Sequence, residues 1–169
     1  FKGGIFVLVI WFLWFKKGKK KLYRPIILIN ILGCFLVMFL ARILARILPY
    51  RLRPLHDDSI ELSLPVNFNE SYAEGLSSFP SDHAALFFAL ATGIYFLNKK
   101  YGIIALLYSL IIICLPRIYL GLHFPSDIMG GATLGIVIII AINKIYFILI
   151  VDGKLRILIT DTRYQRYPY

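Results

Sequence analysis

Long runs of nonpolar residues constrain this chain more than any other feature. One run extends from Ile26 to about Leu48, and another from Pro125 to about Tyr146. Each approaches or exceeds the roughly 20 residues that an α-helix needs to cross the hydrocarbon core of a bilayer. Hydrophobic residues make up 59% of the 169 residues, which is more than soluble domains use. The short alternating segments of a transmembrane β-barrel are not found. We therefore predict an all-α, polytopic transmembrane helical bundle.

Shorter apolar runs bring the predicted number of visible spans to five. Pro25 is expected to open the helix that begins near Ile26, since proline suits the first helical turn. Ser81 is a good N-cap for the next helix, and Pro116 is expected to end the one after it. The run Gly3–Phe15 is short for a span, so we interpret it as the end of a longer helix. The shorter runs cover Gly3–Phe15, Ala84–Asn98 and Tyr101–Leu115.

The distribution of basic residues predicts the orientation of the bundle. The formal net charge is +10, but much of it sits in clusters at the ends of apolar runs, which argues against nucleic acid as a partner. Lysines and arginines beside spans mark the cytoplasmic side, here at Lys16–Lys21, at Lys99–Lys100 and in the tail from Val151. The polar segment 49–82 then lies on the opposite side, and we interpret it as a small extracytoplasmic cap. Cys34 and Cys114 fall inside apolar runs as small buried residues.

One polar stretch between two apolar runs combines three residues that can do chemistry together. Arg117 can bind an oxyanion through its planar fork of donors. His123 can attack phosphorus if a carboxylate holds its other ring nitrogen. Pro125 suits the first turn of a helix, so Asp127 is expected close to His123 and hydrogen-bonded to it. On its own, this stretch is equally compatible with a re-entrant loop that contains a buried Arg–Asp pair.

Three stretches of the chain are predicted to meet at the same membrane face. Charged side chains at membrane depth are costly and usually functional. Arginines can neutralise the oxygens of a transferring phosphoryl group, and a helix N-terminus near Ser81 adds an anion site. Two histidines can then supply a nucleophile and a general acid. The stretches contain Arg46 and Arg53, then Ser81, Asp82 and His83, then Arg117, His123 and Asp127.

Together, these stretches resemble the three signature motifs of the type 2 phosphatidic acid phosphatase superfamily. The resemblance implies one membrane-embedded phosphatase domain over residues 1–169, without a metal or other cofactor. It implies that His123 is the nucleophile that becomes phosphorylated, that Asp127 orients it, and that His83 protonates the leaving group. The implied phosphate-binding residues are Arg46, Arg53, Ser81, Asp82 and Arg117.

The chain departs from the family pattern at three motif positions. Arg46 stands where lysine is usual, Asp82 where glycine is usual, and Pro116 where serine is usual. Asp82 is expected to face away from the phosphate and cap the third helix. The family commonly has six spans, so a further helix is expected upstream. Outside the motifs, we interpret Arg42 as snorkelling to the membrane interface and His56 as a surface residue.

The resemblance predicts an enzyme of the bacterial cytoplasmic membrane whose site faces outward. Its partners would be the bilayer and a lipid phosphate of the outer leaflet; the oligomeric state is not predicted. Lipid A 1-phosphate and undecaprenyl pyrophosphate are favoured as substrates, with phosphatidylglycerol phosphate and phosphatidic acid as alternatives. A non-enzymatic transporter would instead predict broken helices or polar residues at mid-membrane. A haloperoxidase would use the same pocket with vanadate bound.

Overall fold

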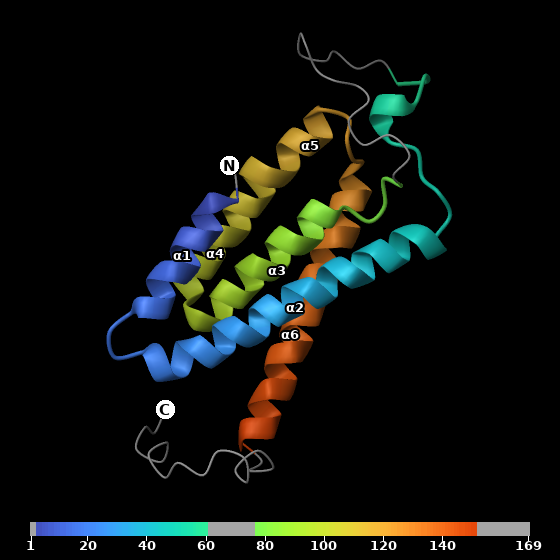
Figure 1. The fold of residues 1–169 in the computed structure, drawn as a ribbon. Helices are drawn as coiled ribbons and strands as arrows, with labels where there is room; N and C mark the ends of the chain where they lie inside the picture. Colours follow the sequence, from blue (N-terminus) through green and yellow to red (C-terminus); the bar gives the residue numbers. More distant parts are fainter. Residues whose placement is uncertain (1–2, 61–76, 152–169) are drawn as a thin grey trace.

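The computed structural model describes residues 3–60 and 77–151, and within these ranges it is a bundle of helices without strands (Figure 1). The predicted basic tail and residues 61–76 of the predicted cap lie outside the described residues. The helices are α1 (Gly4–Phe15), α2 (Lys20–Ile47), the short 3₁₀ turn η1 (Pro54–His56), α3 (Asp82–Leu97), α4 (Lys99–Tyr108), the π-helical segment η2 (Ser109–Cys114), α5 (Leu115–Tyr119) and α6 (Pro125–Val151).

Helix α3 is the centre of the bundle and packs against α2, α4 and α6 (Figure 1). Its contact with α6 is close because small residues line it. A Cβ atom at Gly131 would lie 2.3 Å from the carbonyl oxygen of Ser81, and one at Gly135 would lie 2.3 Å from that of Ala85. Small residues at helix crossings let backbones approach in this way. The two glycines thus let the N-terminal halves of α3 and α6 pack closely against each other.

Large nonpolar side chains cover much of the outside of the bundle, as expected for a multi-pass membrane protein. Three helices have the length and composition to span a bilayer: Lys20–Ile47, the continuous helical stretch Lys99–Tyr119, and Pro125–Leu149. Helices α1 and α3 are apolar but shorter, with 12 and 16 residues. At 1.5 Å per residue, α3 is about 24 Å long, less than the ~30 Å of a typical hydrocarbon core.

Two prolines lie inside helices instead of at their predicted ends. Helix α2 begins at Lys20, so Pro25 does not open it. The helix after the Lys99–Lys100 turn likewise continues through Pro116 to Tyr119. The π-helical segment η2 directly precedes this proline, and the N–H of Leu115 bonds to the carbonyl of Leu110, five residues back. A proline disturbs the regular ladder one turn before itself, and a widened turn there absorbs the disturbance.

A pair of asparagines joins α2 to α6 in the apolar part of the bundle. The Nδ2 atom of Asn143 donates to Oδ1 of Asn30 at 2.6 Å and to the carbonyl of Ile139 at 2.8 Å. Each asparagine is only 7% exposed. Amides at this depth are costly unless they are hydrogen-bonded, so the pair favours one pairing of these two helices.

The basic clusters lie at the opposite end of the bundle from the candidate site. The loop between α1 and α2 and the turn between α3 and α4 are neighbours at one end, whereas η1 and the start of α6 lie at the other (Figure 1). This arrangement agrees with the pattern of basic residues that predicted the orientation.

Candidate active site

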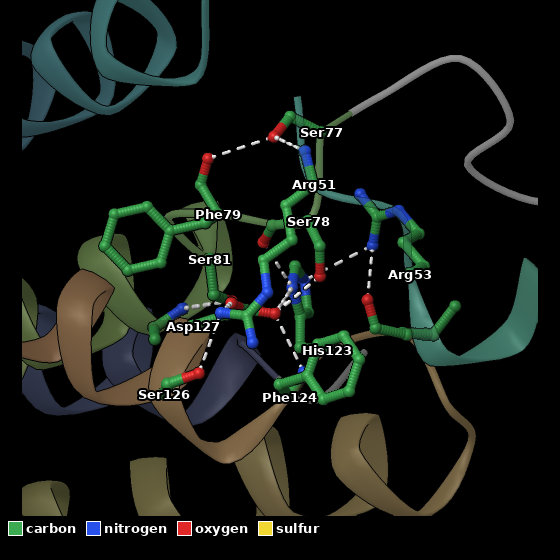
Figure 2. Close-up of polar contacts among 12 residues, drawn as sticks. Arg51, Arg53, Ser77, Ser78, Phe79, Ser81, His123, Phe124, Ser126 and Asp127 are labelled. Atoms are coloured by element: carbon green, nitrogen blue, oxygen red, sulfur yellow. Dashed lines mark hydrogen bonds and ion pairs between the residues drawn. The ribbon is translucent and has the colours of Figure 1, made fainter. Parts of the chain in front are cut away.

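The imidazole of His123 is buried at the start of α6 and held in one orientation. It is 4% exposed and follows Gly121, whose φ of +65° gives the loop after α5 a left-handed turn. Nδ1 lies 2.9 Å from the carbonyl oxygen of Ser78 (Figure 2). Because a carbonyl only accepts, Nδ1 carries the proton, and Nε2 of the neutral ring keeps its lone pair. Nε2 lies 3.5 Å from Nη1 of Arg53.

The surroundings of His123 favour its neutral form. Burial is the largest influence and, together with the nearby charge of Arg53, lowers the pKa of His123 from 6.5 to about 4. Arg117 lowers this pKa further, while the bond to Ser78 and the charge of Asp127 oppose the change. A neutral imidazole whose Nε2 carries no proton can act as a nucleophile near neutral pH.

Asp127 is fully buried and organises the loop around His123 (Figure 2). As predicted, it lies in the first turn of α6. Its Oδ1 accepts from Nη1 of Arg51 at 2.7 Å, and its Oδ2 accepts from the N–H of Phe124 at 2.8 Å and from the hydroxyl of Ser78. The expected hydrogen bond to His123 is not formed, because Nδ1 is 3.9 Å from Oδ2 and bonds to the Ser78 carbonyl instead. Ser78 therefore connects Asp127 to His123.

Arg51 and Ser78 are parts of this network that sequence reasoning missed. Arg51 donates to Ser126 at 2.8 Å as well as to Asp127, and its guanidinium carbon lies 4.4 Å from the centre of the Phe124 ring. A signal for Arg51 existed, since residues two apart in extended chain share a side and Arg53 follows it by two. Ser78 had no comparable signal, because its backbone carbonyl contributes as much as its hydroxyl.

The predicted phosphate-binding arginines differ in how closely they approach His123. Arg53 is buried, and its Nη1 donates to the carbonyl of Leu122 at 2.7 Å. Arg117 is half-buried near the end of α5, close enough to influence the charge of both His83 and His123. Arg46 is exposed in the last turn of α2. The structure thus brings Arg53 and Arg117 to the two histidines and leaves Arg46 at the rim.

The motif residues at the start of α3 have distinct surroundings. Ser81 is fully buried, and its hydroxyl accepts from the N–H of Ala84 at 3.4 Å, which confirms it as the N-cap. Its own N–H donates to the backbone carbonyl of Asp127 at 3.1 Å, so the first turns of α3 and α6 are tied together. His83 is partly buried, one residue after Asp82. Its imidazole lies close enough to interact electrostatically with four other side chains, namely Arg117, His123, Arg53 and Arg42.

Two residues outside the motifs do not have the surroundings that the sequence predicted. Arg42 pairs with Asp82, with 2.8 Å between Nη2 and Oδ2, and so is not simply snorkelling. The pair also explains how a carboxylate is tolerated next to His83. His56 is only partly exposed, and its Nε2 is enclosed by the protein, which does not fit a surface residue. Among the described residues, no three His, Cys, Asp or Glu side chains are grouped so that they could hold a metal ion.

Comparisons with known proteins identify the family. The sequence model of the PAP2 superfamily matches residues 26–150, which include all three motif stretches and the helices that position them. The chain belongs to the PAP2 superfamily. Two relatives are the "Bacitracin transport permease protein BcrC" of Bacillus licheniformis, 33% identical over 98 residues, and the "Putative undecaprenyl-diphosphatase YbjG" of Escherichia coli, 30% identical over 82 residues.

The matched regions cover 57% of this chain and 48% of the first relative, and 48% of this chain and 40% of the second. The match therefore spans less than half the length of these two relatives. No solved structure gives a significant match.

Proposed function

We propose that this PAP2 chain is a membrane lipid phosphatase that works through a phosphohistidine on His123. One observation carries the proposal: a neutral imidazole whose Nδ1 donates to the Ser78 carbonyl, and whose unprotonated Nε2 accepts a 3.5 Å hydrogen bond from Nη1 of Arg53. A buried cation beside a nucleophile is suited to an anionic substrate, because it attracts the oxygens of the group that is attacked.

The proposed reaction has two steps. Nε2 of His123 attacks phosphorus, the bond from phosphorus to the bridging oxygen breaks, and this oxygen leaves with the electron pair and takes a proton from His83. Water then attacks the phosphorus of the phosphohistidine while His83 accepts its proton, and inorganic phosphate is released as the nitrogen–phosphorus bond breaks. General acid–base help of this kind typically contributes a factor of about 10²–10⁴.

The remaining motif residues would bind the phosphoryl group or support those that do. Arg53 and Arg117 are proposed to hold its equatorial oxygens, and Arg46 to close over it from the rim. Ser81 is proposed to contribute the N-terminal end of α3, where backbone N–H groups favour an anion. Asp82, also predicted as a phosphate-binding residue, is proposed to influence the phosphate through the ion pair with Arg42.

The proposed substrate is a lipid phosphate at the outer face of the bacterial cytoplasmic membrane. The site lies at the end of the bundle opposite the basic loops, which supports this side (Figure 1). The name of the YbjG relative supports undecaprenyl diphosphate over the equally predicted lipid A 1-phosphate. Phosphatidylglycerol phosphate and phosphatidic acid are the alternatives.

A transport function is the second candidate, because the name of the BcrC relative describes a permease. The asparagine pair and the π-helical segment η2 are also features that a transporter predicts. However, Nδ2 of Asn143 donates to Oδ1 of Asn30 and to the carbonyl of Ile139 in its own helix, so these groups are engaged within the bundle. The helix at η2 remains continuous to Tyr119. These two observations favour hydrolysis.

Phosphate release by purified protein in detergent tests the proposal, since transport needs a closed membrane and hydrolysis does not. Undecaprenyl diphosphate, lipid A 1-phosphate and phosphatidic acid should be offered side by side. We expect phosphate from at least one lipid, with activity retained in EDTA because no metal takes part in the proposed steps. His123→Gln should abolish release and the acid-labile label trapped from ³²P-substrate. His56→Gln, a matched histidine outside the motifs, should retain both. Equal activity in the two variants would refute the nucleophile.

A further inference from the structure

The arginines near His123 and the arginine on the side of His83 are not the same, and this difference bears on the leaving group. Arg53 lies beside His123, and Arg51 is engaged by Asp127 on the same side. Arg42 pairs with Asp82, the residue before His83, and this ion pair places its guanidinium on the side of His83. Arg42 belongs to none of the three motif stretches.

The guanidinium of Arg42 is held in place but still available. One nitrogen, Nη2, contacts Asp82, and the side chain is 51% exposed. A guanidinium has five N–H donors in a planar fork, so a single contact leaves donors for a second anion. Asp82 is 21% exposed, and its carboxylate would repel a phosphate next to His83 if Arg42 did not neutralise it.

A lipid monophosphate and a lipid diphosphate place different charges beside the general acid. Cleavage of a monophosphate releases an alcohol, whereas cleavage of a diphosphate releases a lipid phosphate that keeps its negative charge. A cation on the side of His83 can therefore bind the departing group of a diphosphate, whereas a monophosphate releases an uncharged alcohol there. Arg42 precedes Arg46 by four residues, so it lies about 6 Å further along α2 toward the membrane interior, where the tail-linked phosphate would lie.

We propose that Arg42, oriented by Asp82, binds the departing lipid-linked phosphate and makes the site selective for lipid diphosphates over monophosphates. This inference rests on the proposed phosphatase function and deepens it. The bond that breaks joins the terminal phosphorus to the bridging oxygen. That oxygen leaves on the lipid phosphate with the electron pair and with the proton from His83, while Arg42 neutralises the second phosphate charge.

Farnesyl diphosphate and farnesyl monophosphate test this inference because they share a tail and differ by one phosphate. In Arg42→Ala we expect kcat/KM for the diphosphate to fall about 10- to 100-fold, the range that one charge-assisted hydrogen bond supplies. Because Arg42→Ala also leaves the Asp82 carboxylate without its counter-charge, the monophosphate is compared in the Asp82→Asn background. There, adding Arg42→Ala should leave the monophosphate rate and the inhibition by orthovanadate, which mimics a single phosphoryl group, within about threefold of Asp82→Asn alone, which shows that the variant is folded. Arg42→Lys should recover part of the loss. Lys20→Ala, which removes a cation from the other end of α2, should change neither substrate.

The double variant Arg42→Ala/Asp82→Asn separates binding from simple charge neutralisation. If Arg42 binds the departing phosphate, the double variant stays impaired on the diphosphate. Full recovery would overturn the proposal, because Arg42 would then only be masking the Asp82 carboxylate. An equal loss on both substrates when Arg42→Ala is added to Asp82→Asn would overturn it too, while leaving the phosphatase function intact. A wild-type protein that releases phosphate from neither substrate nor from any natural lipid would instead refute the proposed function.

Discussion

The protonation of His123 gives the most direct test of the site. Burial and the neighbouring Arg53 lower the pKa of this imidazole to about 4. At pH 5.5 only about 3% of such a group is protonated, compared with about 90% for an ordinary histidine of pKa 6.5. The folded protein therefore binds this proton at a lower pH than the unfolded chain does. The contribution of His123 to the free energy of unfolding is therefore fully present above pH 6.5. It falls by about 3 kcal/mol in total as the pH decreases toward 4.

Nuclear magnetic resonance of ¹⁵N-labelled histidine can follow this titration directly. The chain has three histidines, so a variant with His56→Gln and His83→Gln leaves a single signal. His56 is not among the causes of the lowered pKa of His123, and replacing His83 by an uncharged residue removes the only other histidine charge that interacts with it, so the midpoint reports burial and the two arginines. We expect the signal to remain that of the neutral, Nδ1-protonated ring at pH 5.5 and to change near pH 4. Adding Arg53→Gln should raise the midpoint, because a neighbouring positive charge is removed. A midpoint near 6.5 in the variant that keeps Arg53 would refute the buried, neutral nucleophile.

Three further predictions follow from the same contacts. Asp127→Asn keeps the shape of the side chain but removes the charge 3.9 Å from Nδ1 of His123, so turnover should fall by about 10³–10⁴. Ser78→Ala keeps the backbone carbonyl that binds Nδ1 and should lose far less turnover, and equal losses in the two variants would contradict this order. Gly131→Ala forces α3 and α6 apart and should lower stability by about 1–3 kcal/mol, measured by thermal unfolding in detergent against Gly4→Ala, whose added Cβ meets open space; equal unfolding temperatures would contradict the close packing. Ser59→Cys, without the two native cysteines, should react with an impermeant thiol reagent on intact cells, and labelling only after lysis would reverse the orientation.

The motif spacing carried most of the predictive information in the sequence. The order of Arg53, Ser81 and His123 was readable because each lies in a polar stretch next to an apolar run. Ser81 as an N-cap and Asp127 in the first turn of α6 followed from local rules and are found in the structure. Such features depend on neighbours within a few residues, which a sequence displays directly.

Features that depend on contacts between distant segments were not predicted. Arg42 pairs with a residue 40 positions away and Arg51 with one 76 positions away, and no local pattern marks either partner. Pro116 was expected to end a helix because the local rule ignores a π-helical segment that absorbs the proline. The predicted hydrogen bond from Asp127 to His123 was wrong because Nδ1 of His123 bonds to the backbone carbonyl of Ser78 instead. Every residue has such a carbonyl, so the sequence does not mark this partner.

The hydrogen bond between Asn143 and Asn30 also has a consequence for biogenesis. Helix α2 leaves the ribosome long before α6, since the two asparagines are 113 residues apart. Until α6 is inserted, the amide of Asn30 has to be satisfied by something other than its final partner, at a cost in the hydrocarbon that stays with α2. Insertion of α6 removes the part of this cost that belongs to Oδ1 of Asn30, which then accepts from Asn143. Helix α6 therefore adds to the stability of α2, and a chain that stops before Asn143 would present an unpaired amide oxygen that membrane quality control can detect.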